Sequence, residues 1–197
     1  MEATTSSTRE RLLAAAQELI EQGGYGAASV IAIADRAGVA AGTLYRHFAS
    51  KEELFVDVFR AVCAREERAM RAAAAELPAD GPAVRRLETV LTRFAERALR
   101  NPRLAWALIA EPVDPRVDAE RLAYRERYAA VIAESLTEGI AAGELPEQNV
   151  ALTAAALVGG CGEALVGPLS PLARDAPGPD EIVEALRVFI RRGVGAK

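Results

Sequence analysis

Few residues of this chain have the types and spacing that covalent or metal chemistry requires. His47 is the only histidine, and Cys63 and Cys161 lie far apart with no Cys-x-x-Cys spacing. A base-activated nucleophile would have to use His47, and no phosphate-binding glycine loop or cluster of metal ligands accompanies it. We therefore expect no enzyme, no metal, no cofactor, and two reduced, partly buried thiols.

The segment around residue 38 has a pattern that favours binding to DNA instead. A helix-turn-helix needs a small residue where its helices cross, here Ala34, and a glycine with positive φ in its turn, here Gly38. It also needs apolar residues behind the turn and on the inner face of the second helix, here Ile33, Val39 and Leu44. This pattern leaves the second helix free to enter a major groove.

The neighbouring residues extend this motif. They are Ser29-Val30, Ile33-Ala34, Ala37-Gly38-Val39, Gly42-Thr43-Leu44-Tyr45, His47-Phe48, Ser50-Lys51 and Leu54-Phe55. Together they resemble the DNA-binding signature of the TetR family of transcriptional regulators, in which Gly-Thr-Leu-Tyr-x-His-Phe-x-Ser-Lys is the most specific run. The resemblance covers about residues 8–60, and the rest of the chain resembles the family only in length and helix content.

The resemblance implies a DNA-binding surface on the second helix of the motif. Its residues would be Ala41, Gly42, Thr43, Tyr45, Arg46, His47 and Lys51. Gly42 would allow close approach of the backbone, and Tyr45 would offer its ring to a thymine methyl and its hydroxyl to a phosphate. Lys51 would add its charge to the dipole of the following helix at the DNA backbone. Leu44 and Phe48 would be core.

Three features weigh against strong DNA binding. Family members often have serine or threonine at the position of Ala40 and a basic residue at that of Ala41, so a helix cap and a phosphate contact are lost here. Residues 1–51 contain five basic and five acidic residues, and the whole chain has a net charge of −4. His47 is equally consistent with base contact and with packing.

Caps and breaks predict an all-α fold of about nine helices with no strand. The expected spans are about 9–22, 30–37, 41–47, 51–76, 84–98, 102–111, 115–143, 147–166 and 180–192. Thr8 would cap the first helix, and Ser50 with Glu53 would form a capping box. We expect a three-helix DNA-binding domain at 1–50 and a larger ligand-binding and dimerisation domain at 51–197. The composition, 51% hydrophobic and 26% charged, is that of a globular protein.

The last two helices are the expected dimer interface, because the family pairs them into a four-helix bundle. The helix at 147–166 is too apolar for an ordinary surface helix, and Ala154, Gly159 and Gly160 allow close helix packing. Burial inside the monomer is the alternative. No stretch approaches the roughly 20 uninterrupted apolar residues of a membrane span, and the N-terminus has no signal-peptide pattern, so we expect a cytoplasmic protein.

The ligand site is expected among the middle helices, as in the family. The candidate lining residues are Phe94, Trp106, Glu111, Tyr124, Tyr128 and Cys161. They predict an apolar pocket with few polar groups, in which Glu111 or Glu163 is the polar anchor. An anionic ligand such as an acyl-CoA would need Arg97, Arg121 or Arg125.

The expected function is a dimeric repressor that binds a palindromic operator on double-stranded DNA and is released by a small apolar or amphipathic effector. The same machinery is able to activate transcription. Two alternatives remain: an enzyme that uses His47, and a helical dimer module that has lost DNA binding.

Overall fold

The computed structural model describes residues 7–78 and 81–196, and within them the chain forms nine α-helices, one 3₁₀ helix and no strand. The all-α prediction is confirmed. The elements are α1 (Thr8–Gly23), η1 (Tyr25–Ala27), α2 (Val30–Ala37), α3 (Ala41–His47), α4 (Lys51–Ala75), α5 (Ala83–Arg100), α6 (Pro102–Ile109), α7 (Pro115–Ala141), α8 (Val150–Leu169) and α9 (Pro179–Gly193). The interpretation of the first six residues as lacking a signal peptide, and part of the break before α5, lie outside the described residues.

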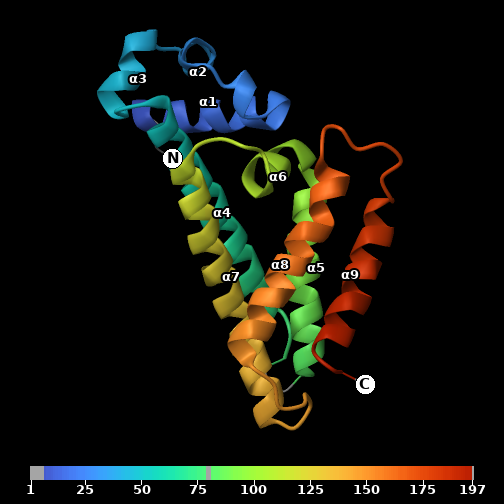
Figure 1. Ribbon diagram of the computed structural model, residues 1–197. Coiled ribbons are helices and arrows are strands. Elements are labelled where there is room, and N and C mark those ends of the chain that lie inside the picture. The colour runs from blue at the N-terminus through green and yellow to red at the C-terminus, as the bar shows by residue number, and fades with distance from the viewer. Residues whose placement is uncertain (1–6, 79–80, 197) are drawn as a thin grey trace, which may run out of the picture.

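The helices form a small unit seated on a larger one (Figure 1). Helices α1–α3 lie together at one end of the molecule, and the long helices α4 and α7 run away from them. Helix α6 lies directly under α1, and α5, α8 and α9 complete the large unit, with α9 along its outer edge. The connection between α8 and α9 is at the same end of the large unit as α6.

Two predicted caps differ in detail from the structure. The N-cap of α1 is Ser7 rather than Thr8: its hydroxyl accepts from the Glu10 amide at 3.2 Å, and the Glu10 carboxylate accepts from the Ser7 amide at 2.7 Å. Serine at this position forms the complete reciprocal box, which explains the one-residue shift. At α4 the hydroxyl of Ser50 accepts from Glu53 as predicted, but the Glu53 carboxylate accepts from the amide of Ala49, not from that of Ser50.

Helix α8 starts three residues later than predicted and ends three residues later. The side chain of Asn149 accepts from the amide of Leu152 at 3.0 Å and fixes the start, while Pro168 lies inside the last turn. By length and composition alone α8 could cross a membrane, which corrects the expectation that no stretch approaches that size. Its leucines, valines and alanines, with Glu163 as its one charged residue, explain the result. A single such helix is weak evidence, because helices of soluble proteins pass the same test.

The buried side chains form two hydrophobic cores. One joins α1–α3 to the first turns of α4, through residues such as Leu54 and Phe55, and the other fills the large unit. The core of the small unit thus extends beyond residue 50. Helix α6 contributes to both cores: Leu104 and Ala107 are buried with α1 and α4, whereas Ala105 is buried in the large unit.

The turn between α1 and η1 generates a stability prediction. Gly24 has φ +74°, and a Cβ added there would lie 2.9 Å from the Glu111 carboxylate and 3.0 Å from the Arg103 guanidinium. Gly24→Ala should therefore lower the free energy of unfolding by about 1–3 kcal/mol. Gly26→Ala is the matched control, because a Cβ at Gly26 meets nothing within 4 Å. Urea denaturation of both variants tests this, and equal stability of the two would contradict it.

Candidate nucleic-acid interface and internal pocket

The turn between α2 and α3 is built as the helix-turn-helix pattern requires. The hydroxyl of Ser29 accepts from the Ala32 amide at 3.1 Å and starts α2, and Gly38 ends it in the left-handed conformation with φ +66°. Arg11 of α1 donates to the carbonyl of Gly38 at 3.2 Å and, through Nε, to that of Ala37 at 3.1 Å. A cation at the C-terminus of α2 complements the helix dipole, so α1 fixes the turn from behind.

Helix α3 has an inner and an outer face. Leu44 and, just beyond the helix, Phe48 are buried in the small core, as predicted. The side chain of Tyr45 is 58% exposed, and Arg46 and His47 are exposed beside it. Ala41 and Gly42 are exposed as well, and Thr43 is half-buried. The polar side chains of α3 are therefore available to a partner molecule.

The N-terminus of α3 has the defect predicted from its sequence. Ala40 is the N-cap residue and provides no side-chain hydrogen bond. The loss of a serine or threonine cap typically costs a helix about 1 kcal/mol. The short helix therefore depends on the burial of Leu44 and Phe48 for its stability.

Lys51, the first residue of α4, is directed at aromatic rings. Its Nζ lies 4.3 Å from the ring centroid of Tyr25 and 5.2 Å from that of Phe55. Burial lowers the pKa of its ammonium group. A phosphate contact by Lys51 remains a prediction, and in it the side chain would exchange these rings for the DNA backbone.

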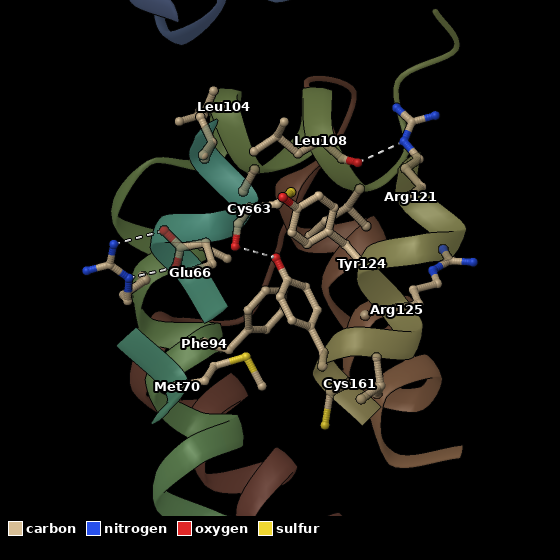
Figure 2. A pocket seen from close by; sticks show the side chains of 18 of the residues that line it. Cys63, Glu66, Met70, Phe94, Leu104, Leu108, Arg121, Tyr124, Arg125 and Cys161 are labelled. Carbon is tan, nitrogen blue, oxygen red and sulfur yellow. Dashed lines mark hydrogen bonds and ion pairs between the residues drawn. The ribbon is translucent and has the colours of Figure 1, made fainter. Parts of the chain in front are cut away.

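An internal pocket of about 560 Å³ lies in the large unit, between α4, α5, α6, α7 and α8. Four of the six predicted ligand residues line it: Phe94, Tyr124, Tyr128 and Cys161. Figure 2 labels Phe94, Tyr124 and Cys161 among the side chains around this pocket. The ring centroids of Phe94 and Tyr128 are 5.9 Å apart, and those of Tyr124 and Tyr128 are 6.0 Å apart. One part of the pocket wall is thus a continuous group of aromatic rings.

The tyrosine hydroxyls are already engaged. That of Tyr128 donates to the carbonyl of Cys63 at 3.2 Å, and that of Tyr124 donates to the carbonyl of Arg60 at 3.1 Å. Burial raises the pKa of both phenols, so both donate as neutral groups. These residues therefore present ring surface rather than hydroxyls to the pocket.

Two predicted ligand residues, Trp106 and Glu111, do not line the pocket. Leu104, Ala105 and Leu108 of α6 face it, and Trp106 packs beside the large core on another side of the helix. Glu111 follows α6, and its carboxylate accepts from the backbone amide of Tyr25 at 3.1 Å. The rotation of α6 about its axis directs Trp106 away from the pocket, and the hydrogen bond to Tyr25 places Glu111 against the small unit.

The three arginines proposed for an anionic ligand all line the pocket. Arg97 makes a bidentate pair with Glu66 at 2.7 and 2.8 Å. Arg121 donates to the carbonyls of Ala107, Leu108 and Glu111 at the C-terminus of α6, at 2.6–2.9 Å. Arg125 is exposed, and its side chain has no hydrogen bond or ion pair within the described residues.

Sequence reasoning missed the contribution of α1 and of two further arginines. Gln17 and Glu21 of α1 line one end of the pocket, together with Arg65 and Arg100. Gln17 and Glu21 are spaced like solvent-exposed helix residues, so the sequence carries no signal for this role. Their position depends on how the small unit is seated on the large one.

The described part of the chain offers no sign of a catalytic or metal centre. No group of three histidine, cysteine or acidic residues in it is placed to hold a metal ion. His47 is exposed on α3 and, within the same residues, its side chain makes no hydrogen bond or ion pair. The arrangement required for the enzyme alternative, with His47 buried beside an acid and a nucleophile, is not found there.

Comparison with known families matches both parts of the chain. Residues 12–58 match a family described as bacterial regulatory proteins of the tetR family, and residues 80–165 match a tetracyclin repressor-like C-terminal domain.

Comparison with individual proteins gives the same result. The HTH-type transcriptional repressor KstR of Rhodococcus jostii is 36% identical over 100 residues, which are 51% of this chain and 45% of KstR, so the match spans about half the length of that relative. An uncharacterized HTH-type transcriptional regulator of Mycobacterium bovis is 30% identical over 72% of both chains. The structure of the regulator FadR from Bacillus subtilis in complex with stearoyl-CoA has a TM-score of 0.76 at 23% identity, and covers 93% of this chain and 98% of that one.

The two thiols generate a prediction about pH. Burial raises the pKa of Cys63 and of Cys161 to about 12. Because the thiolate is the reacting species, the alkylation rate of the folded protein should rise about tenfold per pH unit between pH 7 and 9.5. In denaturant the rate should level off above about pH 8.5, as for ordinary thiols. Iodoacetamide labelling followed by mass spectrometry tests this, and a plateau near pH 9 in the folded protein would contradict it.

Proposed function

The chain belongs to the TetR family of bacterial regulatory proteins, and from this premise we propose that it is a dimeric transcriptional repressor that binds a palindromic operator and is released by a small, largely apolar effector. The observation that carries the proposal is α3: its inner face is fixed by Leu44 and Phe48, and its polar residues point to solvent. A helix supported in this way is able to enter a major groove.

We assign the reading of the operator to α3. Tyr45 and Thr43 would contact bases or phosphates, Arg46 and His47 would add cationic or hydrogen-bonding contacts, and Gly42 would permit close approach. A Cβ at Gly42 meets nothing within 4 Å in the protein alone. A need for glycine at this position would therefore arise from DNA and not from folding.

We assign dimerisation to α8 and α9. Helix α8 exposes Leu152, Ala155, Ala156 and Gly159, and α9 exposes Val188 and Phe189. Exposed apolar residues on two adjacent helices support a partner interface, because a second copy would remove them from water. A two-fold dimer would present two copies of α3 to half-sites about one DNA turn apart.

We assign effector binding to the internal pocket. Its volume lies within the range of sites for small molecules, and its wall is mostly aromatic and aliphatic. The FadR protein of similar fold was solved with stearoyl-CoA. A ligand with an apolar chain and an anionic head, such as an acyl thioester, fits both the apolar wall and the arginines around it.

We infer that α6 carries the signal from pocket to operator. Its residues Leu104 and Leu108 face the pocket and also contact the small core. An effector that moves α6 would disturb the α1–η1 turn, which Glu111 and Arg103 hold by hydrogen bonds. A ligand that binds the displaced state better would then release the operator by linkage.

The first experiment is selection of the purified protein against a random pool of duplex DNA at a fixed salt concentration. The wild type should enrich a palindrome. Tyr45→Ala should relax base preference at one or two positions in each half-site, and Gly42→Ala should weaken binding about tenfold or more without loss of folding stability. A well-folded dimer that enriches no sequence would overturn the repressor and favour a helical module without DNA binding, the class that Ala40 and the neutral N-terminal segment suggest.

The dimer is tested by charge insertion. Phe189 is 42% exposed, and Phe189→Asp should shift the protein towards monomer and weaken operator binding, because a buried unpaired carboxylate opposes association. Leu172→Asp is the matched control, since Leu172 is 85% exposed in the α8–α9 connection. Sedimentation velocity at micromolar concentration measures both variants. A monomeric wild type, or an unchanged dimer in Phe189→Asp, would contradict the assignment.

A further inference from the structure

One end of the pocket lies between the two units of the chain. Helix α1 provides Gln17 and Glu21 there, α4 provides Arg65, and α5 provides Arg100. A molecule that fills the pocket would therefore contact the DNA-binding unit directly, as well as the walls of the large unit. This end is also polar, unlike the aromatic wall formed by Phe94, Tyr124 and Tyr128.

The polar groups at this end form a chain of hydrogen bonds. Nη2 of Arg65 donates to Oε1 of Gln17 at 2.6 Å, and Nε2 of Gln17 donates to Oε1 of Glu21 at 2.7 Å. The glutamine thus connects a cation on α4 to an anion on α1. Within the described residues Arg65 has no carboxylate partner, so a neutral amide is its bonded acceptor.

The second cation at this end is only weakly paired. Arg100 is 71% exposed, and its closest carboxylate, that of Glu96, lies 3.7 Å away on the same helix. By contrast, Arg97 is held by Glu66, and Arg121 is held by backbone carbonyls at the C-terminal end of α6. An anion is therefore better served by Arg65 and Arg100, neither of which has a carboxylate closer than 3.7 Å among the described residues, than by these two.

We propose that this interdomain end of the pocket is the subsite for an anionic effector head group, a phosphate or a carboxylate. In this proposal the head group replaces Gln17 as the hydrogen-bond acceptor of Arg65. The inference rests on the proposed function, because it concerns the same effector site. It adds the head-group chemistry, the residues that bind it, and a direct effect on α1.

Glu21 makes this subsite antagonistic to DNA binding. An anion is a stronger acceptor for a guanidinium than a neutral amide is. The head group therefore displaces Gln17 and breaks the hydrogen bond between Gln17 of α1 and Arg65 of α4. The carboxylate of Glu21 then faces a second negative charge across a short distance, which is unfavourable. The effector consequently binds best when α1 has moved away, and by reciprocity it favours the displaced small unit.

Binding of three C12 probes tests the head group: lauroyl-CoA, laurate and the uncharged dodecanol. Isothermal titration calorimetry should show that lauroyl-CoA or laurate binds the wild type at least about tenfold more tightly than dodecanol does. The better of the two anions identifies the head group as phosphate or carboxylate. Arg65→Gln should reduce the affinity for that anion about three- to tenfold and leave dodecanol unchanged. Arg68→Gln, an exposed position on α4 outside the pocket lining, is the control and should change neither.

Glu21→Gln separates the head-group effect from general damage to the pocket. The variant should bind the anionic probe severalfold more tightly, because the repulsion between Glu21 and the head group is lost. For the same reason, release of operator DNA should need a larger excess of the probe over its dissociation constant. Glu126→Gln, on an exposed position of α7, is the control. Equal binding of charged and uncharged probes, or no response to Arg65→Gln and Glu21→Gln, would overturn the subsite.

The failure of this inference is distinguishable from the failure of the proposed function. Operator binding without probe tests the repressor alone, and dodecanol binding tests the apolar pocket alone. If both are present and the anionic probes have no advantage, the repressor stands and the anion subsite is wrong. If no operator binding is found but the anionic probes bind more tightly than dodecanol, the subsite stands as that of a ligand-binding module.

Discussion

The double role of α6 is the constraint on which the rest of the structure depends. This helix has only eight residues, and yet Leu104 and Ala107 are buried with the DNA-binding unit while Ala105 is buried with the large one. A helix packed into two cores cannot move without disturbing both, because close-packed interiors offer little free volume. The pocket is lined by the same helix, so whatever fills it acts on the element that joins the units.

Polar contacts join α6 and the residues just beyond it to α7 and to the α1–η1 turn. Arg121 holds the C-terminal end of α6 through three carbonyls, and Glu111, just beyond, accepts from the amide of Tyr25. Arg103 donates to the carbonyl of Gly23 at 2.9 Å, and a Cβ at position 24, where φ is +74°, would lie 2.9–3.0 Å from the Glu111 carboxylate and the Arg103 guanidinium. The α1–η1 turn is therefore held from the large unit as well as by its own backbone hydrogen bonds, such as that from the Gly24 amide to the Ile20 carbonyl at 2.8 Å. Displacement of α6 would be transmitted to α1 at this turn.

The local parts of this architecture could be predicted from sequence, and the parts that join distant segments could not. Gly38, Leu44 and Phe48 act through neighbours close in the chain, so their spacing was sufficient to predict the turn and the inner face of α3. Trp106 was assigned to the pocket by its size, although the rotation of α6 places other residues there. Arg65 was missed because its partner, Gln17, lies on another helix 48 positions away. Such contacts depend on the packing of whole helices.

The balanced charge of the N-terminal segment is a misleading guide to DNA binding, because contacts between distant segments decide which of its charges remain unpaired. Arg36 pairs with Glu18 at 2.9 Å, and Arg9 pairs with Asp57 of α4, so these cations and anions neutralise one another within the fold. Arg46 on the outer face of α3 has no such partner in the described part of the chain. Attraction to a phosphate depends on the charges within a Debye length that are not already paired, and the net charge of a segment does not report them. An acidic protein is thus able to present a cationic recognition helix, and equally an electropositive pocket end, because pairing inside the fold decides where charge remains.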